Sequence, residues 1–181
     1  GSKLKISSLI IDDAHACIET VEDQFTINIP RKTDAYSQLH GIFRNSLRQE
    51  CESKAIEIEI NDPTSYMQVP YWTWQDKISD ISKKLINNKK EDCLKWVWPL
   101  VKENLKLSHC VISSSSIEIS PHSIPIHMIP SLIDADRKIF MTATLVDDSI
   151  LVSHFAVSEE QIKHPIVPDS AGDVGDRMIL L

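Results

Sequence analysis

Two adjacent carboxylates, Asp12 and Asp13, directly follow an apolar run, Leu9–Ile11, near the start of the chain. A run of this composition is typical of a buried strand in a parallel sheet, and α/β proteins bind ligands at the C-terminal edge of such a sheet. In nucleotide hydrolases the first acid at this edge holds Mg²⁺, and the next orients or deprotonates the attacking water. The alternative interpretation is an ordinary strand that ends in a polar turn, because short motifs often arise by chance.

A second run that is expected to form a buried strand, Arg137–Met141, leads into the segment TAT at residues 142–144. This segment resembles motif III of superfamily 2 helicases, and Leu9–His15 resembles their motif II, the DEAD/DEAH box. The flanking segments VPYWTW, SIPIHMIPSL, RKIFMTATLVDDSILVSHF and SAGDVGDRMIL look like those of a bacterial family of DEAD/DEAH-box helicase-like proteins. The resemblance covers essentially the whole chain and is strongest from Ser123 to Leu181.

The resemblance implies an ATP-dependent nucleic-acid motor built on a RecA-like core. Carried over by position, Asp12 would bind Mg²⁺ through water, and Asp13 would stand where these helicases usually have the Glu that acts as general base. His15 would link the nucleotide site to motif III, where Thr142 and Thr144 would couple hydrolysis to strand movement. Asp13 is one methylene shorter than Glu, and a base displaced by roughly an ångström can lose ~100-fold in rate. We therefore expect slow turnover, unless the loop has shifted to compensate.

The chain has only four glycines and contains no G-x-x-x-x-G-K-[ST] sequence, so no phosphate-binding loop is recognisable. No arginine-finger motif of a second RecA-like domain is recognisable either. We therefore expect the chain to be part of a larger helicase that binds ATP, Mg²⁺ and single-stranded DNA or RNA together with its remaining domains. By itself, the chain should hold no cofactor and should not hydrolyse ATP. The alternative is a non-catalytic interaction module with a degenerate nucleotide site, as Asp13 in place of Glu would allow.

The distance between the two motifs indicates an insertion. About 130 positions separate Asp13 from Thr142, which is several times the length of one βα unit with its loops. We predict an α/β fold in which residues 3–29 and 131–181 form part of a RecA-like parallel sheet. Residues 30–130 would form an inserted, mainly helical subdomain with short strands. XPD/DinG-like helicases are similar in layout, because a large, mainly helical arch lies between the same two motifs.

Hydrophobic periodicity and turn residues predict the individual elements. Helices are expected from about Thr33 to Ser53, from Trp74 after a Thr73-x-x-Asp76 capping pattern, from about 91 to 107 with a break at Pro99, and at 147–155. Strands are expected at residues 25–29, 56–60, 110–113 and 117–120, the second of these from the strict alternation IEIEI. Leu9–Asp12 and Ile139–Met141 are expected to be neighbouring parallel strands, because motifs II and III must meet beneath the same γ-phosphate.

The middle of the chain combines aromatic and basic residues in the way that a single-stranded nucleic acid requires, with rings that stack on bases and ammonium groups that contact phosphates. The residues that we predict to bind nucleic acid are Trp72, Trp74, Lys83, Lys84, Lys89 and Lys90. The alternative interpretation is that the tryptophans fill the core of a small helical subdomain and the lysines form its solvated face.

Composition limits the remaining possibilities. The net charge is −7, so the chain as a whole does not attract polyanions, and any nucleic-acid contact must be local. No apolar run is long enough to cross a bilayer. The four cysteines are far apart, with no C-x-x-C and no histidine at ligand spacing, which favours reduced thiols in a cytoplasmic protein over a zinc or iron–sulfur site. His122 and His127 lie near prolines, but no acidic or cysteine partner is placed nearby to complete a metal site.

Overall fold

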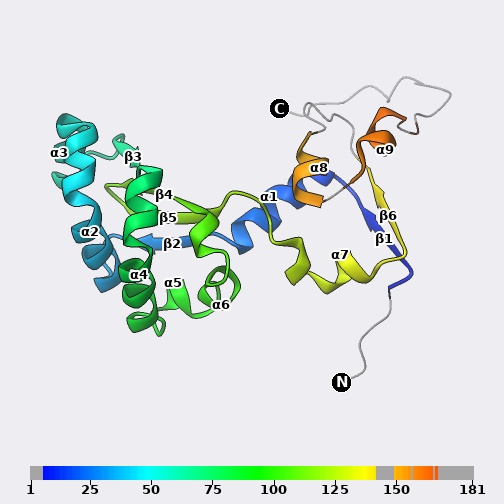
Figure 1. Ribbon diagram of the computed structural model, residues 1–181, viewed down its shortest axis with the longest axis horizontal. Coiled ribbons are helices and arrows are strands. Elements are labelled where there is room, and N and C mark those ends of the chain that lie inside the picture. The colour runs from blue at the N-terminus through cyan, green and yellow to red at the C-terminus, as the bar shows by residue number, and fades with distance from the viewer. Residues whose placement is uncertain (1–5, 142–148, 156, 165, 167–181) are drawn as a thin grey trace, which may run out of the picture. The chain divides into compact units, whose positions relative to one another are not determined.

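The structure, a computed structural model, describes residues 6–141, 149–155, 157–164 and 166 (Figure 1). The chain divides into two compact units, of which the first ends at Leu145. The first unit contains a two-stranded parallel sheet and a four-stranded antiparallel sheet together with helices, so the chain is mixed α/β, as predicted. The second unit contains the short helices α8 (Ser149–Phe155) and α9 (Glu159–Lys163).

The parallel sheet pairs the two strands that carry the predicted motifs. β1 (Ser8–Ile11) lies beside β6 (Arg137–Phe140), with Ile10 opposite Ile139. The ladder continues beyond the strands, because the Met141 N–H donates to the Ile11 carbonyl over 2.8 Å. The predicted parallel pairing of these two segments is therefore confirmed, although about 125 residues lie between them.

The prediction that both of these strands are buried is wrong. Ile10 is 61% exposed and Ile139 is 40% exposed, and of the residues in the two strands only Ile11 is buried. No other strand of the described chain pairs with β1 or β6. A sheet of two strands has too few neighbours to bury both of its faces, whereas parallel sheets normally have both faces covered.

The antiparallel sheet has the strand order β2-β5-β4-β3 and one apolar face. Its strands are β2 (Ile27–Pro30), β3 (Tyr66–Gln68), β4 (Ser108–Ser113) and β5 (Ser116–Pro121). The register aligns buried side chains into two rows across the strands, which are Ile29, Ile117, Ile112 and Met67 in one row and Ile27, Ile119 and Cys110 in the next. Cross-strand apolar pairs of this kind stabilise a sheet that has one wet face.

The run of four serines forms the turn between β4 and β5. The Ser113 hydroxyl accepts hydrogen bonds from the Ser115 and Ser116 N–H groups over 3.3 and 3.0 Å. Serine hydroxyls satisfy turn backbone in this way. The strands predicted at 110–113 and 117–120 are therefore confirmed as a hairpin. The strand predicted at 25–29 also forms, as β2, and it belongs to this antiparallel sheet rather than to the parallel one; the predicted domain boundaries stay a prediction.

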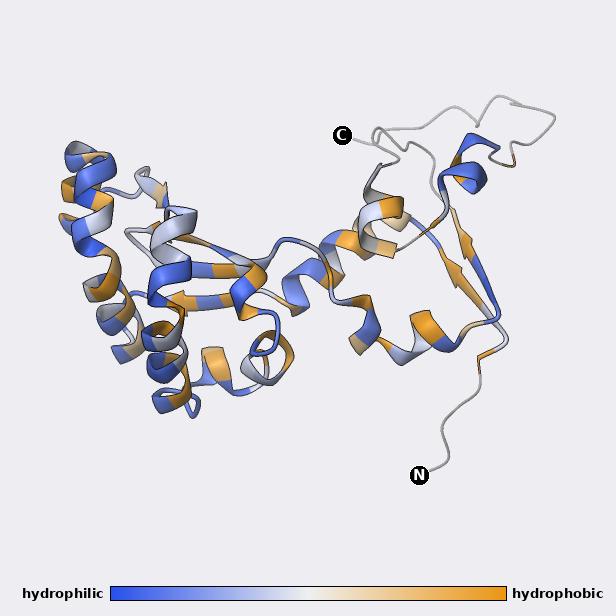
Figure 2. Ribbon diagram, viewed as in Figure 1, coloured by the Kyte–Doolittle hydropathy of each residue, from blue (hydrophilic) through white to orange (hydrophobic). Residues whose placement is uncertain are grey.

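Two long helices pack on the apolar face of the antiparallel sheet: α2 (Asp34–Glu50) and α4 (Tyr71–Asn87). Hydrophobic and hydrophilic bands alternate along both helices (Figure 2), as expected for helices with one buried side. The Phe43 and Trp74 rings stack between them with centroids 6.0 Å apart. The helix predicted from Thr33 is confirmed, and the Thr33 hydroxyl caps it by accepting from the Tyr36 N–H over 3.2 Å.

The predicted start of α4 at a Thr73 cap is wrong, because Thr73 is buried inside the helix and Pro70 precedes its first turn. The helical pattern predicted at 91–107 is divided, as Pro99 requires, since proline is tolerated only in the first turn. The remaining short elements are α5 (Asp92–Lys95), α6 (Trp98–Val101), a 3₁₀ turn at Leu105–Leu107, a 3₁₀ turn at Ile126–Met128 and α7 (Pro130–Asp134).

The strand predicted at 56–60 is wrong, because this segment belongs to the helix α3 (Glu52–Glu59). A Schellman motif ends the helix: the Asp62 N–H donates to the Glu57 carbonyl over 2.9 Å, and Asn61 has a left-handed backbone with φ 70°. Within α3, Ile58 is buried whereas Ile60, which follows the last turn, is 70% exposed. The alternation of isoleucine and glutamate therefore does not correspond to two faces of a strand.

Arg31 connects the end of α3 to the β4–β5 turn. Its Nη1 donates to the Ile58 carbonyl over 2.9 Å and to the Ser114 carbonyl over 3.0 Å, while Nη2 donates to the Glu59 carbonyl over 2.9 Å. The last carbonyls of a helix have no intrahelical donor and carry partial negative charge. The guanidinium therefore satisfies these groups and holds α3 against the sheet.

A second arginine cluster holds α3 to α2. Arg44 contacts both carboxylate oxygens of Glu59, with Nε–Oε1 at 2.8 Å, and Arg48 contacts the same carboxylate at 2.7 Å. These hydrogen bonds lower the pKa of Glu59 from its ordinary value of 4.5 to about 2. The ion pairs are partly solvated, since the side chains of Arg44 and Arg48 are 51% and 38% exposed.

Replacing Arg31 by Met should lower the free energy of unfolding by roughly 2–3 kcal/mol, because three carbonyls lose a charged donor. In this variant, the backbone amides of α3 should lose more protection from hydrogen exchange than those of α2. Hydrogen exchange with mass spectrometry would measure this difference. Lys32→Met, a change at an exposed neighbour, is the control. Unchanged stability and unchanged α3 protection in the Arg31 variant would contradict the role given to this residue.

The Glu59 cluster should make stability depend on pH. Because the folded pKa is lowered to about 2, the stabilisation is complete above the unfolded value near 4.5 and is lost as the pH falls through about 2. Glu59→Gln should therefore cost about 1 kcal/mol near neutral pH, a small value because the arginines are solvated. Denaturant unfolding measured down to about pH 2 should show the two proteins converge. Glu52→Gln is the control, and a difference that is independent of pH would exclude this mechanism.

Candidate functional site

The carboxylates Asp12 and Asp13 occupy the junction between β1 and the helix α1 (Ala14–Gln24). Both side chains are exposed, whereas Ala14 and Ile18 on the same helix are buried and fix its first turns. The Asp13 N–H donates to Asp12 Oδ1 over 3.0 Å. The junction therefore presents two carboxylates to solvent from a backbone that is anchored on both sides.

Asp13 has an unusual backbone conformation. It precedes the first turn of α1 and accepts a hydrogen bond from the Ala16 N–H over 3.4 Å, yet its φ of 49° and ψ of 69° are left-handed. Residues at this position of a helix normally have an extended backbone. Aspartate and asparagine enter the left-handed region several times more often than other side chains with a Cβ. The conformation gives a physical reason for aspartate at this position, where the resemblance leads us to expect glutamate.

The end of β6 lies directly beside this junction. The Ala14 N–H donates to the Met141 carbonyl over 3.0 Å, next to the bond from Met141 to Ile11. The residue before Thr142 is thus held against the turn that carries Asp12 and Asp13. Thr142 and Thr144 themselves lie outside the described residues, so their coupling role stays a prediction.

His15 is the second residue of α1, and its side chain is outside what the structure describes. Within the described residues, no three histidine, cysteine, aspartate or glutamate side chains are grouped so as to hold a metal ion. Magnesium bound through water by one carboxylate needs no such group, since this ion keeps several waters and takes few protein ligands. The predicted Mg²⁺ contact of Asp12 therefore stays a prediction.

Trp74, predicted to stack on bases, is a core residue. It is 1% exposed, and its indole N–H donates to the Leu105 carbonyl over 2.9 Å. Its ring packs against Phe43 and offers no face to a ligand. The alternative interpretation is therefore right for Trp74. Trp72 is different, since it lies on the solvent side of α4 and is 63% exposed.

The lysines predicted to act with Trp72 are dispersed. At 100° per residue, Lys83 lies about 20° from Trp72 around α4, but Lys84 lies about 120° away. Lys83 also pairs with Asp80 at 3.7 Å. Lys89 and Lys90 are exposed but follow the far end of the helix, roughly 20 Å along its axis from Trp72. The structure does not bring the six predicted residues into one surface.

Trp96 is an exposed aromatic residue that is not among those predicted to bind nucleic acid. It is 73% exposed, and the Lys95 ammonium lies 4.8 Å from the centre of its ring. Leu94 and Trp98, two residues away on either side, are buried. Apolar residues at this spacing around Trp96 were the signal that could have separated it from the core tryptophans.

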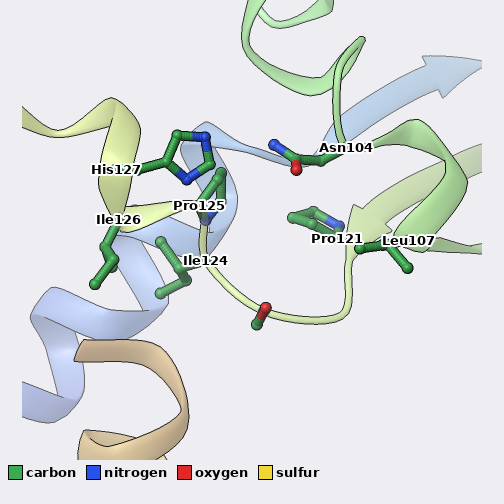
Figure 3. A pocket seen from close by; sticks show the side chains of 8 residues that line it. Asn104, Leu107, Pro121, Ile124, Pro125, Ile126 and His127 are labelled. Carbon is green, nitrogen blue, oxygen red and sulfur yellow. The ribbon is translucent and has the colours of Figure 1, made fainter. Parts of the chain in front are cut away.

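A hollow lies where β5 leaves the antiparallel sheet (Figure 3). It is lined by Asn104, Leu107, Pro121, Ser123, Ile124, Pro125, Ile126 and His127. The Asn104 Nδ2 atom is buried and has no hydrogen-bond partner in the described part of the chain. No acidic or permanently cationic side chain lines the hollow, so it lacks the groups that a nucleotide phosphate with Mg²⁺ requires. None of the predicted site residues lines it either.

No family model matches the sequence, and no significant match was found among curated proteins or among solved structures. Among the helices of the described residues, none combines the length and the apolar composition that a bilayer-crossing helix requires.

The left-handed backbone of Asp13 should determine which substitutions it tolerates. Asp13→Asn should leave the free energy of unfolding nearly unchanged, because asparagine adopts this conformation and caps helices equally well. Asp13→Glu should cost about 1 kcal/mol and Asp13→Ala somewhat more, since alanine also removes the cap. Urea unfolding of the three variants is the measurement. Equal stability of the glutamate variant and the parent would show that the backbone does not favour aspartate here.

Proposed function

We propose that this chain is part of an ATP-dependent nucleic-acid helicase or translocase of superfamily 2. In this proposal it supplies the acids for Mg-ATP hydrolysis and the strand that couples hydrolysis to nucleic acid. The observation that carries the proposal is the parallel pairing of β1 with β6. The pairing holds the Asp12–Asp13 turn beside Met141, the residue that precedes Thr142.

The geometry of the carboxylates supports the roles that the resemblance assigns to them. Asp12 follows the last residue of a parallel strand and is exposed, so water-mediated contact with Mg²⁺ is open to it. Asp13 lies one residue further, where a group that positions the attacking water is required. Its present hydrogen bond to the Ala16 N–H is long, at 3.4 Å, and therefore weak.

The proposed RecA-like core accounts for the exposed apolar side chains of the parallel sheet. Ile10 and Ile139 lie on strands that have no other partner among the described residues. In a RecA-like sheet these strands are central, with helices on both faces. The remaining domains of the same protein would then supply the covering elements and the phosphate-binding loop, with ATP and Mg²⁺ as cofactors. Residues 30–130 would be the insertion, and the protein would act in the cytoplasm.

A second candidate is a non-catalytic interaction module with a degenerate nucleotide site. One observation favours it: the Asp13 carboxylate already serves as the cap of α1. In that case the paired strands would keep their structural role while hydrolysis is lost.

The test is nucleic-acid-stimulated ATPase activity of the full-length helicase that we propose. Asp12→Asn should reduce turnover to background, because the Mg²⁺ contact is lost while the turn keeps its shape. Glu19→Gln, which changes an exposed acid on α1, should retain activity. Normal turnover of the Asp12 variant would exclude the assignment of the site. An unmutated full-length protein that hydrolyses no ATP would favour the interaction module.

A further inference from the structure

The segment that follows α4 and includes α5, residues 88–96, concentrates positive charge in an acidic protein. Between residues 83 and 96 there are five lysines and two acids, in a chain whose net charge is −7. Lys89, Lys90 and Lys95 are all exposed. We call this segment the basic turn.

The two acids between residues 83 and 96 do not both face the exposed lysines of the basic turn. Glu91 Oε1 accepts the Ala35 N–H over 3.3 Å, so this carboxylate faces the start of α2. Asp92 is exposed, and Asp34 at the start of α2 is a further acid on an adjacent element. The three exposed lysines of the turn therefore outnumber the acids that share its surface.

The basic turn is fixed by interactions with the core. Asn88 Nδ2 donates to Gln38 Oε1 over 3.3 Å and to the Lys84 carbonyl over 2.8 Å, which closes the end of α4 against α2. Leu94 is completely buried and anchors α5. Because these contacts set the backbone, the lysines and Trp96 are presented without a cost for ordering the turn on binding.

Trp96 adds an exposed indole ring to the basic turn, and a loop that is merely charged and solvated does not require such a ring. Exposing most of an indole to water is unfavourable, and tryptophan is normally much more buried. The Lys95 ammonium lies 4.8 Å from the ring centre, so a flat aromatic surface and a cation are presented together. Single-stranded nucleic acids are bound by this combination, since bases stack on the ring and phosphates approach the cations.

We infer that the basic turn is a binding site for single-stranded nucleic acid, with one base stacked on Trp96 and adjacent phosphates at Lys89, Lys90 and Lys95. The inference extends the proposed function by naming the residues that contact the strand. It replaces the dispersed set that includes the buried Trp74. An acidic protein partner would also be attracted by the lysines, but it would not use the sequence-independent stacking that Trp96 provides.

Fluorescence anisotropy with labelled oligothymidylate and oligouridylate, at low salt and without nucleotide, tests the site. The complete chain should bind at least one of these strands, and preference for one of them identifies DNA or RNA. Trp96→Ala should weaken binding by about 10-fold or more, while Trp96→Phe keeps most of the affinity, because stacking contributes the energy. Trp72→Ala is the matched control, since it removes another largely exposed tryptophan, on α4 and outside the basic turn.

Charge variants test the phosphate contacts separately. Lys89→Gln with Lys90→Gln should reduce the slope of log K against log salt by about 1.4, the value for two phosphates of a single strand. Lys54→Gln, at an exposed lysine on α3, should leave the slope unchanged. Far-ultraviolet circular dichroism and urea unfolding confirm that each variant is folded.

Several outcomes would overturn the inference: no binding of either strand at low salt, equal loss in the Trp72 and Trp96 variants, or tighter binding of duplex or of an acidic peptide. Because no ATP is present, such a result leaves the hydrolysis proposal untouched. Conversely, binding that depends on Trp96 would remain valid if the full-length protein showed no ATPase activity.

Discussion

The parallel pairing of β1 with β6 is the constraint on which the rest of the first unit depends. Parallel neighbours cannot be joined by a tight turn, so the chain must leave the C-terminal end of β1 and return to the N-terminal end of β6. An ordinary connection needs one helix, but here it contains a complete antiparallel sheet with its own helices. The same pairing brings Met141 to the Asp12–Asp13 turn. The pairing of these two strands therefore determines both the connectivity of the first unit and the position of the candidate site.

The long connection contains a hydrophobic core of its own, which includes no residue of the parallel sheet. Isoleucines in adjacent strands form two rows on one face, and the Phe43–Trp74 pair fills the space between the covering helices. Arg31 then satisfies the carbonyls at the end of α3, where the helix meets the β4–β5 turn. By contrast, the parallel sheet leaves Ile10 and Ile139 exposed. Because the antiparallel sheet is covered and the parallel sheet is not, we propose that a larger sheet surrounds β1 and β6.

Sequence patterns were reliable where one physical signal acted alone. The apolar runs before the acids and before residues 142–144 predicted the two paired strands, and the spacing in α2 predicted a helix with one buried side. The strand prediction for IEIEI failed because period-two alternation also occurs in a short helix, and Asn61 and Asp62 form a helix C-terminus rather than a turn after a strand. The exposure of β1 and β6 could not be predicted, since the number of strands around them is not a local property. The prediction of which aromatic residues contact nucleic acid failed for a similar reason, because composition does not separate the buried Trp74 from the exposed Trp96.

Our proposals assign opposite charges to different parts of the chain, and this separation has a physical basis. A magnesium site needs carboxylates that are not neutralised by lysine, whereas a phosphate-binding surface needs lysines that are not paired with acids. Where the two kinds of residue are mixed on one helix, they pair with each other, as Lys83 does with Asp80. Asp12 and Asp13 instead follow a strand, and the basic turn directs Glu91 inward to the Ala35 N–H. A protein with a net charge of −7 can therefore retain a local attraction for a polyanion, provided that the attraction acts within about one Debye length of the turn.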